Sequence, residues 1–170
     1  MLALTRRLLV FACASLALVS GCGGSAPASA AHPKLNQEVT LTLPSNDGKL
    51  VTVPLRGKRA VVLDFFGPTC KPCEKAVPAL QSKRAELAAK GAELVLVAVL
   101  GDGENTEQAA AALQKWGVKG ASFLVDKNDA SRRDLGVHAL PSTIVVDDKG
   151  VVRWVAPQDA SPADVLAAVP

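Results

Sequence analysis

Two short segments in the first third of the chain alternate between apolar and polar residues. They span residues 38–43 and 50–53, and the turn-forming run Asn46-Asp47-Gly48 lies between them. Alternation with a period of two is typical of a strand with one buried face, and Asn, Asp and Gly are common in the turns that join such strands. The pattern therefore predicts an N-terminal β-hairpin.

Two longer apolar runs flank a segment of helix-forming composition. Residues 60–66 and 93–100 are almost continuously apolar, as in strands that are covered on both faces. Between them, residues 70–90 are rich in Ala, Leu, Glu, Lys and Arg, and Gly91 is suited to end a helix. Strand, helix and strand at this spacing predict a βαβ unit with a parallel, right-handed connection.

The remaining elements are predicted from capping and turn signals as well as from hydrophobicity. Asn105 and Gln108 form a possible capping box, the run from Asp147 to Gly150 is a hairpin turn, and Ser161 is suited to cap a last helix. The expected order is helix, strand, helix, two strands and helix (residues 106–116, 122–125, 130–135, 143–146, 151–155 and from 162 onward). Together with the βαβ unit, these elements predict one α/β domain with a mixed central sheet flanked by helices.

The first 22 residues have the order of a secretory signal. Arg6 and Arg7 precede an apolar run that ends in small residues before Cys22. The run is shorter than the ~20 residues that a helix needs to span a bilayer. The motif Val19-Ser20-Gly21-Cys22 resembles the bacterial lipobox, in which the Cys is acylated and becomes the new N-terminus.

The lipobox resemblance divides the chain into three parts. These are a signal peptide over residues 1–21, lipidated Cys22 with a flexible tether to residue 34, and a folded domain over residues 35–170, the tether being rich in Gly, Ser, Ala and Pro. The resemblance implies an extracytoplasmic lipoprotein anchored to a membrane, and Gly23 favours the outer membrane if the cell is Gram-negative. The alternative is an ordinary signal peptide cleaved later, near Ala30.

Charge and aromatic content narrow the possible partners. Arg6 and Arg7 account for two of the 19 basic residues, and 16 acidic residues nearly balance the rest. The chain has no Tyr, and only 4% of its residues are aromatic. A near-neutral domain with few stacking side chains argues against nucleic acid as a partner.

Cys70 and Cys73 follow a buried strand and lie where the next helix is expected to begin. At the first turn of a helix, unpaired backbone N–H groups and the helix dipole favour an anion, so the Cys70 thiolate is stabilised and the pKa of Cys70 is lowered. The Lys71 cation acts in the same direction, and Pro72 stiffens the turn. Cys70 is therefore the expected nucleophile, and Cys73, one turn further on, the resolving thiol.

Three further features of the sequence strengthen the pattern. Asp64 lies six residues before Cys70, Pro78 lies five after Cys73, and Leu140-Pro141-Ser142-Thr143 enters a strand. On these features the chain resembles the thioredoxin superfamily over residues 61–155. The preceding hairpin, and an extra helix and strand between residues 91 and 135, are more similar to the TlpA-like disulfide reductases of bacterial envelopes, although Thr69 stands where those proteins commonly have Trp.

The resemblance implies a thioredoxin-like fold and a role for each residue. A buried Asp64 has a raised pKa and accepts the proton of Cys73, while a cis Leu140–Pro141 bond lets its loop present backbone groups to substrate. The resemblance implies no metal and no cofactor other than the redox-active disulfide. The implied partners are protein disulfides or dithiols in the envelope and a membrane donor of reducing equivalents, with cytochrome c maturation as one client pathway and a monomer as the working form.

Other classes of protein would use the same two cysteines for a different purpose. A structural zinc site needs four ligands, and the domain has only the two thiols and His138. A copper-binding chaperone similar to the Sco type would use Cys70, Cys73 and His138, although that type has three residues between its cysteines. A peroxiredoxin is disfavoured because Pro68-Thr69-Cys70 lacks that family's wider spacing. The direction of electron flow is left open.

Overall fold

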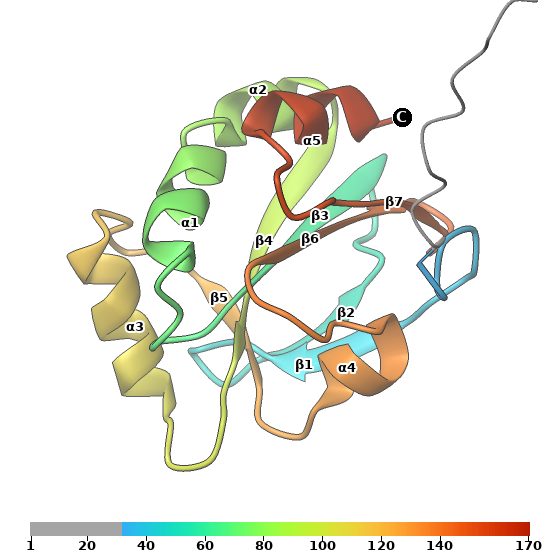
Figure 1. Cartoon of the computed structure of the whole chain (residues 1–170). Coiled ribbons are helices and arrows are strands. Elements are labelled where there is room, and N and C mark those ends of the chain that lie inside the picture. Colours follow the sequence, from blue (N-terminus) through green and yellow to red (C-terminus); the bar gives the residue numbers. More distant parts are fainter. Residues whose placement is uncertain (1–31) are drawn as a thin grey trace, which may run out of the picture. The chain divides into compact units, whose positions relative to one another are not determined.

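The structure is a computed structural model that describes residues 32–170 (Figure 1). The signal peptide, Cys22 and the first part of the expected tether lie outside the described residues. The elements in chain order are β1 (Leu41–Pro44), β2 (Leu50–Val53), β3 (Ala60–Phe66), α1 (Cys73–Gln81), α2 (Arg84–Ala89), β4 (Ala92–Val99), α3 (Thr106–Lys115), β5 (Phe123–Asp126), α4 (Ala130–Leu135), β6 (Ser142–Asp147), β7 (Val152–Val155) and α5 (Pro162–Ala168).

A five-stranded mixed sheet forms the centre of the domain, in the order β5-β4-β3-β6-β7. β4 pairs in parallel with β3 and β5, whereas β6 is antiparallel to β3 and to β7. Every residue of β3 is buried, as expected for an apolar strand at the centre of a sheet. The predicted βαβ unit and the predicted α/β class with a mixed sheet are thus confirmed.

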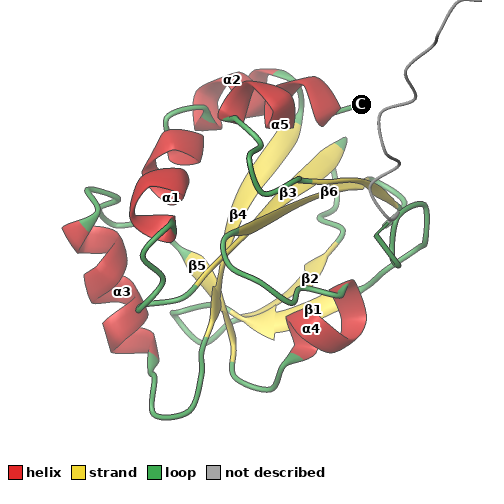
Figure 2. Cartoon of the chain, viewed as in Figure 1, coloured by secondary structure: helices red, strands yellow, loops and turns green. Residues whose placement is uncertain are grey.

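Different elements pack on the two faces of the sheet (Figure 2). Val61, Leu63 and Phe65 of β3 pack in a core with the β1–β2 hairpin and α4. The alternate residues Val62 and Phe66 pack in cores that contain residues of the α1 and α5 helices, with α2 and α3 contributing at the two ends. The period-two alternation of β3 therefore fixes which of its side chains face α1.

The N-terminal hairpin forms a separate two-stranded sheet, β1–β2, whose presence was predicted. Its first strand begins at Leu41 rather than residue 38, because Gln37 and Val39 make backbone hydrogen bonds with the β6–β7 region and Glu38 bridges Val151. At the other end, Ser45 bridges Leu124 of β5. The segment that carries the hairpin therefore lies along both outer strands of the central sheet.

The prediction of one helix over residues 70–90 is wrong in two respects. The helix begins at Cys73 instead of Cys70, with Pro72 as its N-cap residue. It also breaks between Gln81 and Arg84, where Ser82 donates its hydroxyl hydrogen to the carbonyl of Ala79 and the Lys83 N–H bonds the carbonyl three residues back. A polar side chain that bonds its own backbone and a tightened last turn both end a helix, so α1 and α2 are separate.

Two of the predicted helix caps are present in full. Asn105 and Gln108 exchange side-chain-to-backbone hydrogen bonds at the start of α3, and Ser161 and Asp164 do so at the start of α5. Such reciprocal bonds satisfy N–H groups that a helix leaves unpaired. The capping box of Asn105 and Gln108 also fixes the start of α3, directly after the loop beside the cysteine pair.

Candidate active site

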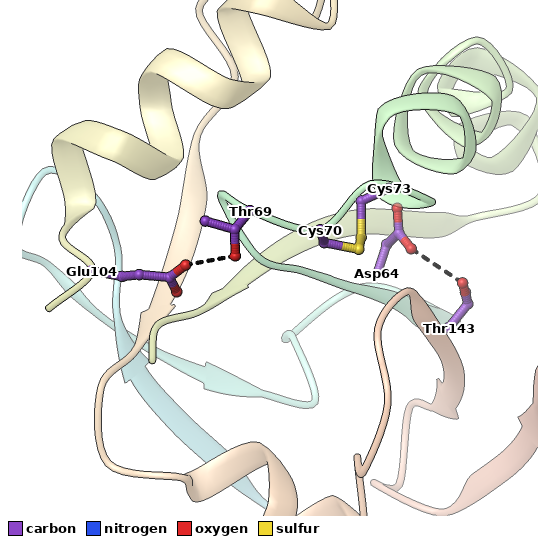
Figure 3. Close-up of a disulfide and its surroundings, with 6 residues drawn as sticks. All are labelled: Asp64, Thr69, Cys70, Cys73, Glu104 and Thr143. Carbon is purple, nitrogen blue, oxygen red and sulfur yellow. Dashed lines mark hydrogen bonds between the residues drawn. A yellow bond between two sulfur atoms is a disulfide. The ribbon is translucent and has the colours of Figure 1, made fainter. Parts of the chain in front are cut away.

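Cys70 and Cys73 form a disulfide at the junction of β3 and α1 (Figure 3). Their Cα atoms lie 5.3 Å apart. Cys70 belongs to the turn that precedes α1, and its backbone N–H donates to the carbonyl of Gly67 at 3.1 Å. Cys73 is the first residue of the helix and is completely buried, whereas Cys70 is partly exposed. Of the two sulfur-bearing residues, only Cys70 can therefore meet a partner molecule directly.

Lys71 extends from the turn into solvent. Its side chain is 81% exposed and forms an ion pair with Glu74 at 3.3 Å. Water and the Glu74 carboxylate both screen its charge, so its field at Cys70 is weak.

We expect Lys71→Gln to change the rate of disulfide exchange at Cys70 by less than about fivefold, because exposed charge pairs contribute ~1 kcal/mol or less. The measurement is the second-order rate of attack on a small aromatic disulfide at pH 7, with Lys115→Gln, a more distant partner of Glu74, as control. A loss of tenfold or more specific to Lys71 would show that this cation tunes the thiol strongly.

Thr69, which precedes Cys70, is held by a residue from another loop. Its hydroxyl donates to Glu104 Oε1 at 2.9 Å, and the other carboxylate oxygen of Glu104 accepts from the Gly101 N–H at 2.8 Å (Figure 3). The Gly101–Asn105 loop is thereby joined to the rim of the disulfide. Nothing in the sequence indicated this contact, because the two side chains are 35 residues apart.

Asp64 points from β3 toward the face of the sheet that carries α1. Its side chain is 2% exposed, and the Thr143 hydroxyl donates to its Oδ1 at 3.1 Å (Figure 3). Its Oδ2 is buried with no hydrogen-bond partner in residues 32–170. Burial raises the pKa of Asp64 to about 7, and the hydrogen bond from Thr143 opposes this in part. Asp64 thus gains and loses a proton near neutral pH.

The β3–β6 register explains why Thr143 is the partner of Asp64. The two residues are directly opposite in the antiparallel pair, so their side chains share one face. From the sequence, Thr143 was expected only as part of a motif, with no role of its own. The pairing register could not be read from a single chain, although a Thr next to the Leu140-Pro141 motif was the available signal.

The Leu140–Pro141 loop reaches the turn that carries Cys70. The peptide bond between these residues is cis. Leu140 and Cys70 both pack at the edge of the core cluster that contains Cys73. A Cβ at Gly67 would lie 3.2 Å from Leu140 Cδ1, so glycine lets the two loops approach closely. The structure therefore brings Leu140 beside the turn that carries Cys70.

His138 is not assembled with the two cysteines into a ligand set. Over residues 32–170, no group of three His, Cys, Asp or Glu side chains is arranged to hold a metal ion. His138 instead lies at the exposed end of a cavity that Asp64 also lines. The three copper ligands expected under the chaperone alternative are thus not brought together in this disulfide form.

The chain is similar to known proteins over most of the described residues. The AhpC/TSA family pattern matches residues 36–155. Thiol-disulfide oxidoreductase ResA of Geobacillus thermodenitrificans is 32% identical over 98 residues, which are 58% of this chain and 53% of ResA. Thioredoxin-like protein YneN of Bacillus subtilis is 32% identical over 99 residues, 58% of this chain and 55% of YneN. The chain spans little more than half the length of these relatives.

Solved structures share the fold. StoA from Bacillus subtilis aligns with a TM-score of 0.65 at 15% identity, over 79% of this chain and 99% of StoA. A putative thiol:disulfide interchange protein DsbE from Chlorobium tepidum aligns with a TM-score of 0.62 at 26% identity, over 81% of this chain and 98% of that protein. With the sheet order and the hairpin, these similarities confirm the predicted thioredoxin-like fold.

Proposed function

Because the chain belongs to the AhpC/TSA family of thioredoxin-like proteins, we propose that it is a thiol-disulfide oxidoreductase that acts through Cys70 and Cys73. The family resemblance stated from the sequence is confirmed by the match over residues 36–155. The observation that carries the proposal is the disulfide itself, with one partly exposed and one buried cysteine at a strand–helix junction. The names of the relatives support the same chemistry.

The geometry supports a two-step exchange in the reduced protein. The Cys70 thiolate attacks a substrate disulfide, forms a mixed disulfide and releases the first substrate sulfur as a thiolate. Cys73 then loses its proton to Asp64 and attacks the Cys70 sulfur, so the second substrate sulfur leaves and the Cys70–Cys73 disulfide forms. Two electrons pass from the protein dithiol to the substrate, and Leu140 and Pro141 contact the bound substrate chain.

The test of this function is reduction of insulin disulfides by the full chain in the presence of dithiothreitol. We expect precipitation of the insulin B chain well before it occurs with dithiothreitol alone, and no acceleration by the Cys70→Ala variant. Equal lag times for wild type, Cys70→Ala and the reductant alone would contradict the proposal.

We also propose that the chain is a lipoprotein of the cell envelope. The basic pair, the short apolar run and the Val19–Cys22 motif support this placement. Within residues 32–170, no helix is long and apolar enough to cross a membrane. On this proposal the substrates are envelope proteins, cytochrome c maturation is one client pathway, a membrane protein supplies the reducing equivalents, and the working form is a monomer.

The anchor is tested by fractionating bacteria that express the full chain. Wild type is expected to sediment with membranes and to resist extraction by high salt, because two or more acyl chains bind a bilayer stably. Cys22→Ser is expected to appear in the soluble fraction or to keep its signal peptide. Cys13→Ser, which changes a cysteine inside the apolar run, is the matched control and should stay with the membrane. A Cys22→Ser protein that is processed and sediments like wild type would contradict acylation.

A further inference from the structure

A cavity of about 320 Å³ lies behind the candidate active site, between the middle and end of α1, the Leu140–Pro141 loop and the segment before α5. Asp64, Pro141 and Thr143 line it, whereas neither Cys70 nor Cys73 does. Exposed residues of its lining, among them His138, Gln158 and Ser161, open it to solvent. A water molecule occupies roughly 30 Å³ in the liquid, so the cavity has room for several.

The buried end of the cavity holds a polar atom that needs a partner. Asp64 lines this space, and its Oδ2 has no hydrogen-bond partner among the described residues. A buried carboxyl oxygen without a partner costs free energy, and water bound in a polar cavity is the usual remedy. The cavity therefore gives Asp64 a solvent path that does not pass the two sulfur atoms.

The proposed function requires such a path. While a substrate is bonded to Cys70 and contacts Leu140 and Pro141, it covers the sulfur side of the site. The proton that Asp64 takes from Cys73 must then leave by another side, because it otherwise returns to Cys73 before the thiolate attacks. The cavity opens toward the segment before α5, and neither cysteine lines it.

We propose that this cavity conducts the proton from Asp64 to solvent and that His138 at its mouth is the group that passes it on. This inference rests on the proposed function. In each turnover Cys73 gives its proton to Asp64, Asp64 gives it to water in the cavity, and the neutral imidazole of His138 accepts it from that water and releases it to bulk solvent. No electrons move in these steps, and Asp64 returns to its carboxylate form.

The cavity lining contains three titratable side chains within residues 32–170, and only one of them suits this role. Asp64 is the source of the proton. His32 is held on both sides, because its Nε2 bonds the Gly136 carbonyl at 3.3 Å and its Nδ1 accepts from the Lys34 N–H at 3.3 Å. His138 is exposed and makes no side-chain hydrogen bond to the described residues, so both of its nitrogens are available. An imidazole nitrogen can accept a proton from water and release it again, as a relay requires.

The test separates the two chemical steps by rapid mixing of the reduced full chain with a disulfide whose two thiols have different absorbance. His138→Gln is expected to leave the first release, by Cys70, unchanged and to slow the second release by roughly tenfold at pH 7. This loss is smaller than the ~10²-fold typical of removing a general acid or base, because water still reaches the mouth. Added imidazole should restore the second rate. His32→Gln is the matched control and should keep both rates.

Each outcome decides between the alternatives. A second release that is unchanged in His138→Gln, that falls equally in His32→Gln, or that imidazole does not restore would overturn the role of His138. In an Asp64→Asn background, His138→Gln should cause no further slowing, and an additional loss there would also overturn it. If wild type itself releases neither thiol, the proposed function fails, which is a separate result.

Discussion

Replacing Cys73 with Ser is expected to trap substrates on the protein and to lower turnover by at least ~10³-fold. Cys70 is partly exposed and keeps its ability to attack, so a mixed disulfide still forms. Its resolution requires a second sulfur at the buried first position of α1, where Cys73 lies. A serine hydroxyl is not a nucleophile toward disulfides, so the adduct accumulates.

The measurement is mass spectrometry of the adduct formed with a peptide disulfide, together with non-reducing electrophoresis of proteins captured from an envelope extract. Cys70→Ser is the matched control, because it keeps the same number of thiols and removes the accessible one. It should form no adduct. Adducts of equal abundance on both variants would mean that the buried position of Cys73 does not define its role.

The second large effect concerns stability and its dependence on pH. The pKa of Asp64 is about 7 in the folded protein, against 3.8 for an ordinary Asp. The folded protein therefore holds this proton over a range in which the unfolded chain has lost it, and stability falls as pH rises from about 4 to about 7. Above pH 7 both states are ionised and the loss is complete, at about 4 kcal/mol.

Asp64→Asn removes this loss, because the amide carries no charge and its oxygen can still accept from the Thr143 hydroxyl. We expect the oxidised variant to be more stable than wild type by about 4 kcal/mol at pH 8 and to match it within about 1 kcal/mol at pH 4. Urea unfolding at the two pH values measures the difference. The other acidic groups contribute equally to the unfolding free energies of wild type and variant, so their effects cancel in the difference. The same variant should slow the second chemical step.

Asp126 offers a matched control of opposite sign. It is also buried, but its carboxylate accepts backbone N–H groups of Asn128, Ala130 and Ser131. An amide nitrogen cannot accept, so Asp126→Asn leaves a backbone donor unpaired and should destabilise the protein by about 1 to 3 kcal/mol. Stabilisation by both substitutions, or by neither at pH 8, would contradict the special environment of Asp64.

The parts of the fold that were predicted correctly depend on local patterns. The apolar run of β3 coincides with the buried strand, and the Asn105 and Ser161 boxes mark the starts of two helices, because capping involves neighbours in the chain. The start of α1 was missed because the turn before it has no hydrophobic periodicity. The break after Gln81 was also missed. It depends on the Ser82 hydroxyl, whereas the helix-forming composition of the whole segment favoured one continuous helix.

The residues of the candidate site also fall into those that could be predicted from the sequence and those that could not. Cys70 and Cys73 could be selected from their spacing and Asp64 from the family resemblance, and the structure places all three at one strand–helix junction. The partners Thr143 and Glu104 could not, because the first depends on strand register and the second on a contact between two loops. The position of His138 at a cavity mouth required the packing of α5 against the sheet.

The placement of the N-terminal segment has a consequence for solubility. The outer strands of an open sheet expose unpaired N–H and C=O groups that can join a second molecule and start aggregation. Here residues 36–39 bond along β7, and the hairpin turn at Ser45 and Asn46 bonds β5, so one short stretch of chain shields both borders. A domain that forms while this stretch is absent or undocked would expose two self-associating edges. Docking of this stretch, which directly follows the expected tether, therefore also protects the domain against fibrillar association.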